Sequence, residues 1–325
     1  TWTPTNHEGD INLDYRLDST WFAGQQIIVF EELWYNGVCI ISHEHYSDSN
    51  GNYGMNNLEQ TVHVASVHTN AFSFQTGEQM LAYDEHATIT DFVYYGNVEV
   101  GQRYFVEGTL WGCYTDEAGQ IHSVPISVED GGRVCSDVFT ANEAEGVVEV
   151  LFTIDSTLLA RNGYDYIVVT ERLIHTGSNV CIANHSDLSD QAQTIQVPNV
   201  HTTATTETGH TLPEGANSDI RPVTVTDRVY YENLIPGKSY TVVGNLQYAR
   251  TDAEGNITES GALIQNGQPV TASKTFVPES STGYVDLEFT VNAADIMMHD
   301  YNRIVAFEDL YFGPEGIRVA VHADI

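Results

Sequence analysis

The stretch CIANHSDLSDQAQTIQVP, residues 181–198, contains four side chains that could take part in a reaction. They lie beside a predicted strand and are His185, Asp187, Asp190 and Gln193. An imidazole can move a proton, paired carboxyl groups can share one, and a carboxamide can be attacked by a nucleophile. The pattern is typical of a catalytic site, a metal loop or a polar turn. The choice among these depends on what the chain places opposite Gln193.

Similar side chains recur in register elsewhere in the chain. Glutamates followed by x-Leu end three predicted strands, and histidines end the three strands that come next: Glu31, Glu171 and Glu308, then His43, His185 and His322. Gln60 precedes Thr61 just as Gln193 precedes Thr194. The pentapeptides VHTNA (67–71) and VHTTA (200–204) place Thr69 and Thr202 on opening strands. First and last strands of many sandwiches are neighbours, so we expect Thr69 to meet Gln193.

The chain also repeats on a larger scale. Residues 88–110 align without gaps with 224–246, and residues 149–173 align with 286–310 and again with 12–33. A repeat of about 135 residues is the size of a domain, so it indicates an array of similar modules rather than solenoid turns. Within each module apolar and polar residues alternate, with Pro-Gly and Asp-x-x-Gly turns between the runs. This predicts an all-β fold of tandem immunoglobulin-like sandwiches arranged as beads on a string.

Composition excludes several classes of partner. The 325 residues include 12 basic and 45 acidic side chains, which give a formal charge of −33. Nucleic acid and anionic membrane surfaces would be repelled by such a chain. No run of about 18 apolar residues is present, so no membrane span is expected.

We expect three units. Residues 1–62 carry the second half of a module, residues 63–199 form a complete one, and residues 200–325 lack the segment that would contain a counterpart of Gln193. The parent protein is expected to continue in both directions.

These motifs resemble the VaFE repeats, or Thr–Gln ester-bond domains, of Gram-positive surface adhesins. The resemblance rests on strands such as IIVFEEL and IVAFEDL and on HSDLSDQAQT, which fits H-x-D-x-x-D-x-x-Q-T at every position. It covers essentially the whole chain and implies a CnaB-related sandwich that stacks into stalks. It also implies an intramolecular ester, with Thr69 as nucleophile, Gln193 as electrophile, and His185, Glu171 and Asp190 as promoting residues.

The chemistry suits those residue types. A threonine hydroxyl must lose a proton to attack a carboxamide, and the departing ammonia must gain one, so a neighbouring imidazole helps both steps. Two carboxyl groups forced together share a proton, and the neutral one can stabilise the developing oxyanion. A bond from Thr69 to Gln193 would close a loop of about 125 residues and stabilise the unit by about 5 kcal/mol in the chain-entropy model.

The two outer units depart from the motif. In the first, Asn57 and His45 replace the two aspartates, an insertion precedes Gln60, and no threonine strand is present. The third has Thr202, Glu308, His322 and Asp324 but no counterpart of Gln193. Only the middle unit is expected to close by itself.

Three alternatives stay open in the sequence. Asp187 and Asp190 have the ligand type for Ca²⁺, although no D-x-D-x-D-G loop is present, and we otherwise expect no cofactor. Cys113 and Cys135, at the ends of a predicted hairpin, could form a disulfide or stay as thiols. The function could be a self-crosslinked extracellular stalk anchored at the cell wall, a module whose long loops bind a host protein or glycan, or a hydrolase using Thr69 with His185. We favour the stalk, whose partners would be neighbouring domains of the same chain or fibre, and not a turnover enzyme.

Overall fold

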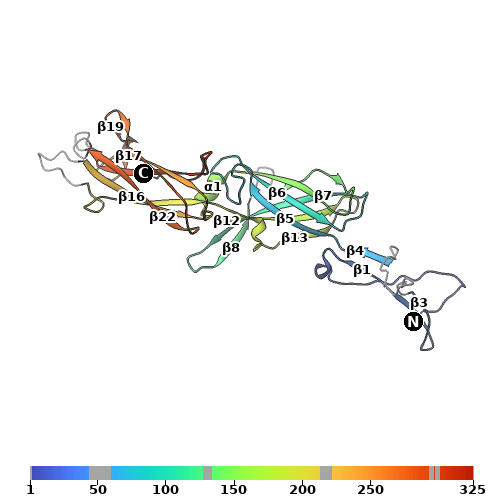
Figure 1. Cartoon of the computed structure of the whole chain (residues 1–325). Helices are drawn as coiled ribbons and strands as arrows, with labels where there is room; N and C mark the ends of the chain where they lie inside the picture. The colour runs from blue at the N-terminus through green and yellow to red at the C-terminus, as the bar shows by residue number, and fades with distance from the viewer. Residues whose placement is uncertain are drawn as a thin grey trace.

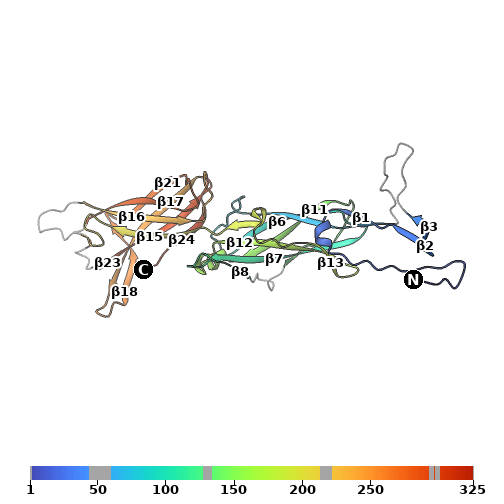
Figure 2. The same ribbon diagram turned by 90° about the horizontal axis from the view of Figure 1, so that it is seen from below.

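The computed structural model describes residues 2–43, 60–126, 134–212, 222–292, 296 and 301–324. The regular secondary structure of these described residues is nearly all β-strand, which confirms the predicted all-β class. The units follow one another along the molecule from the N-terminal to the C-terminal end (Figures 1 and 2). Within the described residues, no helix is long and apolar enough to cross a membrane.

The middle unit is a sandwich of two antiparallel sheets. One sheet has the order β11-β6-β5, formed by Gly146–Ile154, Ala87–Gly96 and Ser66–Ser73. The other has the order β10-β7-β12-β13, formed by Phe139–Thr140, Arg103–Thr115, Tyr166–His175 and Val180–His185. Three short strands lie beside that path: β8 (Ile121–Pro125) and β9 (Val134–Cys135) on β7, and β14 (Thr194–Gln196) on β12.

The C-terminal unit repeats this plan. Its first sheet has the order β15-β16-β22, formed by Asn199–Thr205, Pro222–Glu232 and Gly283–Asn292. Its second has the order β18-β17-β23-β24, formed by Ile257–Ala262, Tyr240–Thr251, Arg303–Phe312 and Ile317–His322. Further short strands are β21 (Thr271–Phe276) on β17 and the pair β19–β20 (Ile264–Gln265 and Gln268–Pro269).

The described part of the N-terminal unit consists of two small ribbons and a 3₁₀ turn, η1 (Ser19–Phe22). Strands β1 (Gln26–Ile28) and β4 (Thr61–His63) form one ribbon, and β2 (Glu31–Tyr35) and β3 (Val38–His43) form the other. Apolar side chains such as Trp21, Trp34 and Ile41 stay exposed. The unit therefore encloses little apolar surface of its own among its described residues.

Each complete sandwich has its own core, produced by side chains that alternate between the inside and the outside of the strands. In β16, for example, buried and exposed positions alternate along the strand. Ile89, Leu110, Phe152, Ile167 and Ile195 are fully buried in the middle unit. Period-two alternation of this kind is what fills the space between two packed sheets.

Capping and turn residues account for a short helix and two hairpins. Asp155 caps the short helix α1 (Ser156–Arg161) by accepting from the backbone N–H groups of Thr157 and Leu158. The turns at 116–120 and 252–256 close the hairpins β7–β8 and β17–β18. Residues 292–300, at the corresponding place of the C-terminal unit, lie largely outside the described residues.

The suggested disulfide between Cys113 and Cys135 is wrong. Cys113 lies opposite Ser123 on β8, and its Sγ is 3.3 Å from Ser123 Oγ. Cys135 lies opposite Glu107, six positions back along β7. Six residues of strand span about 20 Å, far beyond the reach of an S–S bond. The described cysteines form no disulfide.

Candidate functional site

Two residues of the site come from the first sheet of the middle unit. Thr69 lies opposite Val93, and Ala71 lies opposite Asp91, in the β5–β6 pair. Side chains two positions apart share a face, so Thr69 and Asp91 both point into the sandwich as diagonal neighbours. Both are buried, with Thr69 4% and Asp91 0% exposed.

The second sheet supplies Glu171 and His185. These two residues lie directly opposite each other in the β12–β13 pair, and Gly108 of β7 lies opposite Glu171 on its other side. Glu171 is 1% exposed, whereas His185 is partly exposed. The site therefore bridges the two sheets, with a threonine and an aspartate facing a glutamate and a histidine.

Gln193 reaches this space from a 3₁₀ turn rather than from the last strand itself. The turn, η3 (Gln191–Gln193), begins at Asp190, whose carboxylate accepts from the backbone N–H of Ala192. Strand β14 then begins at Thr194 and pairs with β12. The turn directs the Gln193 carboxamide inward, and the residue is 0% exposed.

The structure brings Gln193 and Thr69 together, as the sequence predicted. Gln193 Nε2 donates to Glu171 Oε2 at 2.6 Å and to Thr69 Oγ1 at 3.2 Å. The three side chains are separated by up to 124 positions in sequence and are all buried. A nucleophile and a carboxamide are thus held in hydrogen-bond contact away from water, an arrangement that favours a large proximity effect.

Asp91 is a residue that the sequence did not single out. Burial raises the pKa of Asp91, and burial together with the nearby Asp91 charge raises the pKa of Glu171 far above its usual range. Both carboxylate oxygens of Asp91 and Oε1 of Glu171 are buried without a hydrogen-bond partner among the described residues. Two carboxyl groups in one dry site hold a shared proton. The available signal was the aspartate of the repeated T-x-T-D-x-V-Y-Y motif.

Asp190 contacts His185 and the η3 turn, so it is not the carboxyl group that shares a proton with Glu171. Its Oδ2 lies 3.2 Å from His185 Nε2, while its Oδ1 caps η3. His185 Nδ1 is buried and unsatisfied among the described atoms. Asp190 thus orients the imidazole, and Asp91 is the carboxyl group that faces Glu171.

Asp187 holds the turn before η3. Its Oδ1 accepts from the backbone N–H and the hydroxyl of Ser189, at 2.9 and 2.6 Å. These bonds, the side-chain bond first, lower the pKa of Asp187. Asp187 and Asp190 therefore use their carboxylates on different partners. Within the described residues, no group of three or more His, Cys, Asp or Glu side chains is arranged around a metal position.

The C-terminal unit assembles most of a second site. Asp227 and Glu308 are buried, Thr202 is half-buried, and His322 Nδ1 lies 3.2 Å from Glu308 Oε2. Burial, reinforced by the Glu308 charge, raises the pKa of Asp227 to about 8. Burial also raises the pKa of Glu308 to about 7. Asp324 is exposed near the end of the described chain.

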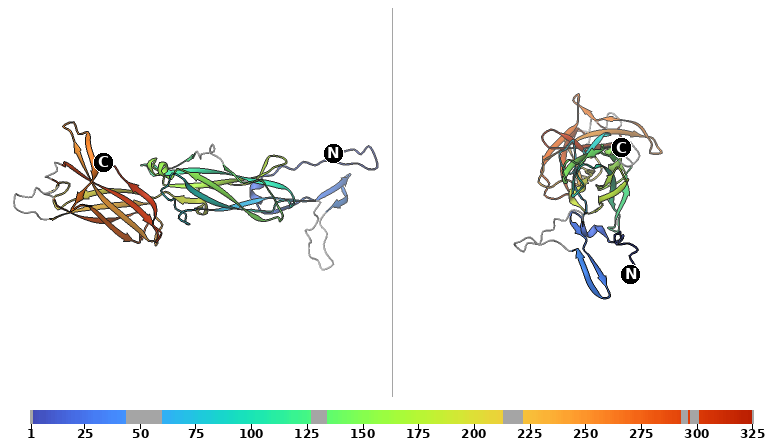
Figure 3. Two further views of the ribbon diagram at one scale, coloured as in Figure 1. Left: turned by 90° about the horizontal axis from the view of Figure 1, so that it is seen from above. Right: turned by 90° about the vertical axis from the view of Figure 1, so that its right-hand side faces the viewer.

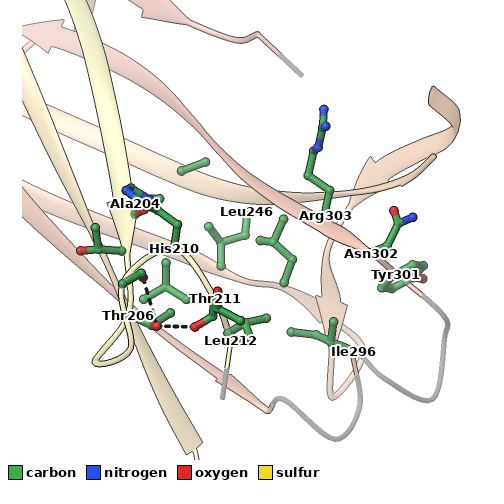
Figure 4. Close-up of a pocket in the computed structure, with 15 residues that line it drawn as sticks. Ala204, Thr206, His210, Thr211, Leu212, Leu246, Ile296, Tyr301, Asn302 and Arg303 are labelled. Carbon is green, nitrogen blue, oxygen red and sulfur yellow. Dashed lines mark hydrogen bonds between the residues drawn. The ribbon is translucent and has the colours of Figure 1, made fainter. Parts of the chain in front are cut away.

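A pocket of about 580 Å³ opens beside this second site (Figure 4). Leu212, Leu246 and Ile304 are among its lining residues. Ile304 corresponds to Ile167 of the middle unit, where β14 inserts the buried Ile195. The pocket therefore lies where the middle unit packs its last strand.

The N-terminal unit assembles the complementary part. Gln60 Nε2 lies 2.8 Å from Glu31 Oε2 and 2.9 Å from His43 Nδ1, and Glu31 lies opposite His43 in the β2–β3 pair. Glu31 and His43 are substantially exposed here. Asn57 and His45 lie outside the described residues.

The two sheets of this β-sandwich bring a buried threonine, glutamine and glutamate together with a partly exposed histidine. The chain belongs to the T-Q ester bond containing domain family, whose model matches residues 1–64, 65–197 and 198–325.

Comparisons with solved structures give weak likenesses. A bacterial adhesin from Mobiluncus mulieris containing intramolecular disulfide, isopeptide and ester bond cross-links is 15% identical in one crystal form, covering 76% of this chain and 80% of that chain, with a TM-score of 0.27. Its other crystal form is 14% identical, with coverages of 78% and 83% and a TM-score of 0.28. A DUF4466 family protein from Parabacteroides merdae is 9% identical, with coverages of 70% and 98% and a TM-score of 0.25. No curated protein matches the chain. At these scores the structural likenesses carry no argument about function.

Proposed function

We propose that this chain is a load-bearing segment of a bacterial surface adhesin or fibre, whose middle unit locks itself with an ester between Thr69 and Gln193. The observation that carries the proposal is the buried contact between Thr69 Oγ1 and Gln193 Nε2. The family to which the chain belongs supports the same chemistry. An end-to-end series of units with sealed strands suits a stalk that resists pulling, and it would be displayed outside the cell.

The reaction is an acyl transfer within one chain. The Thr69 hydroxyl oxygen attacks Cδ of Gln193, the C–N bond breaks, and the nitrogen leaves as ammonia. We assign the removal of the hydroxyl proton to His185, whose imidazole is held by Asp190 at 3.2 Å. Glu171, in contact with the leaving nitrogen and holding a proton jointly with Asp91, is placed to return one. General acid and base steps of this kind each accelerate a reaction by roughly 10²–10⁴-fold.

The same geometry favours a single turnover over enzyme catalysis. Nucleophile and electrophile belong to one chain, and Thr69, Glu171 and Gln193 are all buried. A separate substrate would have to displace the Gln193 side chain from the space that it fills. The promoting residues therefore act once, on their own domain, and need no cofactor.

Intact mass spectrometry tests the proposal directly. The ester lowers the mass of the chain by one ammonia, about 17 Da, and hydroxylamine should cleave it. Thr69→Ala and Gln193→Ala should each retain the full mass expected from their sequence. Thr202→Ala is the matched control, because it changes the corresponding threonine of the C-terminal unit, and it should retain the mass deficit. An unmodified full mass in the folded wild-type chain would refute the crosslink, and a hydrolase would additionally show turnover.

A further inference from the structure

Two asparagines occupy corresponding positions at the junctions between units. Asn97 lies in YGNVEVGQRY and Asn233 in YENLIPGKSY, in the loop after the second strand of each complete unit. Both adopt a left-handed backbone conformation, with φ of 60° and 61°. Asparagine tolerates this conformation better than most residues, so the side chain is held in a fixed direction at little cost.

Each asparagine contacts the same point of the preceding unit. Asn233 Nδ2 donates to the carbonyl of Val197 at 3.1 Å, and Asn97 Nδ2 donates to the carbonyl of Val64 at 3.2 Å. The two valines are themselves equivalent. The N–H of Val197 donates to Asp165 O, and the N–H of Val64 donates to Gln25 O, both at 2.9 Å.

The first junction has two contacts more at the same asparagine. Asn97 Nδ2 also donates to Gln25 O at 2.8 Å, and its Oδ1 lies 3.0 Å from His63 Nδ1. The side-chain amide therefore contacts both strands of the β1–β4 ribbon at the same end, where Gln26 pairs with His63 and the N-terminal unit ends.

A buried tyrosine of the same unit is hydrogen-bonded to each asparagine loop. In the middle unit the N–H of Glu99 donates to the Tyr104 hydroxyl at 3.2 Å. In the C-terminal unit the N–H of Ile235 donates to the Tyr240 hydroxyl at 2.9 Å. Each of these N–H groups lies two positions after the asparagine. These tyrosines are 3% and 1% exposed, so each loop is attached to the core of its own unit. Because each asparagine loop is attached to its own core, its contact with the preceding unit can fix the orientation of one unit relative to the other.

The second junction adds side-chain contacts that cover more surface. Met80 of the middle unit is fully buried against the C-terminal core, where the Tyr240 hydroxyl donates to its Sδ at 3.4 Å. Tyr83 N–H donates to Arg318 O at 2.8 Å, and Lys238 pairs with Glu78. The close succession of the middle and C-terminal units is visible in Figure 3.

We propose that this asparagine loop is a docking surface for the end of a preceding unit of the same kind, and that it sets one repeated geometry between successive units. The partner is recognised by a backbone carbonyl at its last strand, which any unit with this fold presents. The side chains around the contact, such as Met80, then adjust the stiffness of each joint. This inference does not depend on the ester.

Hydrogen exchange on the full chain tests the docking surface. Asn97→Gly and Asn233→Gly keep the left-handed backbone but remove the amide, so exchange in 62–66 and 195–200, respectively, should become roughly two- to tenfold faster. Asn266→Gly is the matched control, because Asn266 also has a left-handed backbone, with φ of 53°, and lies in the β19–β20 turn within the C-terminal unit. Small-angle scattering of the double variant should show a broader distribution of lengths.

Two results would overturn the inference: unchanged exchange at the junctions, or exchange that rises equally in the Asn266→Gly control. If a glycine variant loosened its whole unit, Asn97→Asp and Asn233→Asp would decide, because they keep the shape and Oδ1 but remove the donors. In that case exchange must rise at the junction alone. All variants should keep the mass deficit of the wild-type chain, which separates this test from that of the ester.

Discussion

In the proposed reaction the nitrogen of Gln193 must gain a proton to leave as ammonia, and Glu171 Oε2 lies 2.6 Å from that nitrogen. Asp91 raises the pKa of Glu171 by its charge, in addition to the effect of burial. Burial and the neighbouring Asp91 carboxyl group therefore both favour the protonated form of Glu171. Asp91 acts in this scheme as a positioning residue for a proton.

Replacing Asp91 by asparagine tests this role without changing the volume of the side chain. We expect Asp91→Asn to slow ester formation by about 100-fold at pH 7, because Glu171 loses the charge that raises its pKa. The rate is followed as the appearance of the mass deficit after refolding. The pH at which the rate falls should also move down, which a merely structural defect would not produce. Asp227→Asn is the matched control in the C-terminal unit, and an equal slowing there would argue against the assignment.

The second carboxyl pair gives a prediction about pH. Asp227 and Glu308 have pKa values of about 8 and about 7, raised from values near 4 in an unfolded chain. The folded unit therefore binds more protons than the unfolded one between about pH 4 and pH 8. Its stability is fully present below that window and declines as the pH rises through it.

We therefore expect the C-terminal unit to melt at a higher temperature at pH 5 than at pH 8. Differential scanning calorimetry of the full chain would follow this transition. Asp227→Asn should weaken the dependence, because it removes the carboxyl group whose pKa is raised to about 8 and leaves only Glu308 of the pair to titrate in this window. A transition temperature that rises with pH over this range would contradict the assignment.

At the scale of the elements, a glycine lies opposite each glutamate. Gly108 faces Glu171, and Gly244 faces Glu308. A Cβ at Gly108 would collide with Cζ of Phe152, and one at Gly244 with Phe289 and Leu287. The glycine thus lets an aromatic ring close over the strand beside the glutamate, which helps to exclude water from the reacting groups.

Gly108→Ala should destabilise the middle unit by about 1–3 kcal/mol and also slow ester formation, since Phe152 must move away from the site. Gly112→Ala is a suitable comparison, because Gly112 lies on the same strand, four residues from Gly108. A Cβ at Gly112 would meet the Tyr164 ring. We expect a similar loss of stability with a normal rate of ester formation. Urea unfolding on a Thr69→Ala background and the refolding mass assay measure the two effects separately. Equal rates for the two variants would remove the special role of Gly108.

The elements also show what the sequence could predict. The recurrence of Glu171, His185 and Gln193 in register, together with Thr69 on an opening strand, was sufficient to predict their meeting. Asp91 was visible only as a repeated letter, because periodicity reports which face a residue occupies but not which side chain of the opposite sheet it meets. The contacts of Asn97 and Asn233 likewise give no signal in the sequence, since their partners are mainly backbone carbonyl groups that any sequence supplies.

For the whole molecule, the ester would change how the chain responds to force. Thr69 and Gln193 lie near the two ends of the middle unit in sequence, 124 positions apart. Once they are joined, a force applied through the linkers passes across the bond and does not reach the segment between them. The C-terminal unit, with no counterpart of Gln193 in residues 200–325, keeps no such protection within these residues.

Single-molecule pulling on the full chain separates the two units. A fully extended segment gains about 3.3–3.6 Å per residue, so the 124 positions would release roughly 40 nm if the middle unit unfolded. The wild-type chain should lack this step and show only the extension of the C-terminal unit, whereas Thr69→Ala should show both. The C-terminal step serves as the internal control for attachment and calibration. A step of roughly 40 nm from the middle unit in a chain that carries the mass deficit would mean that the bond joins other residues, because a Thr69–Gln193 ester leaves that length no way to extend.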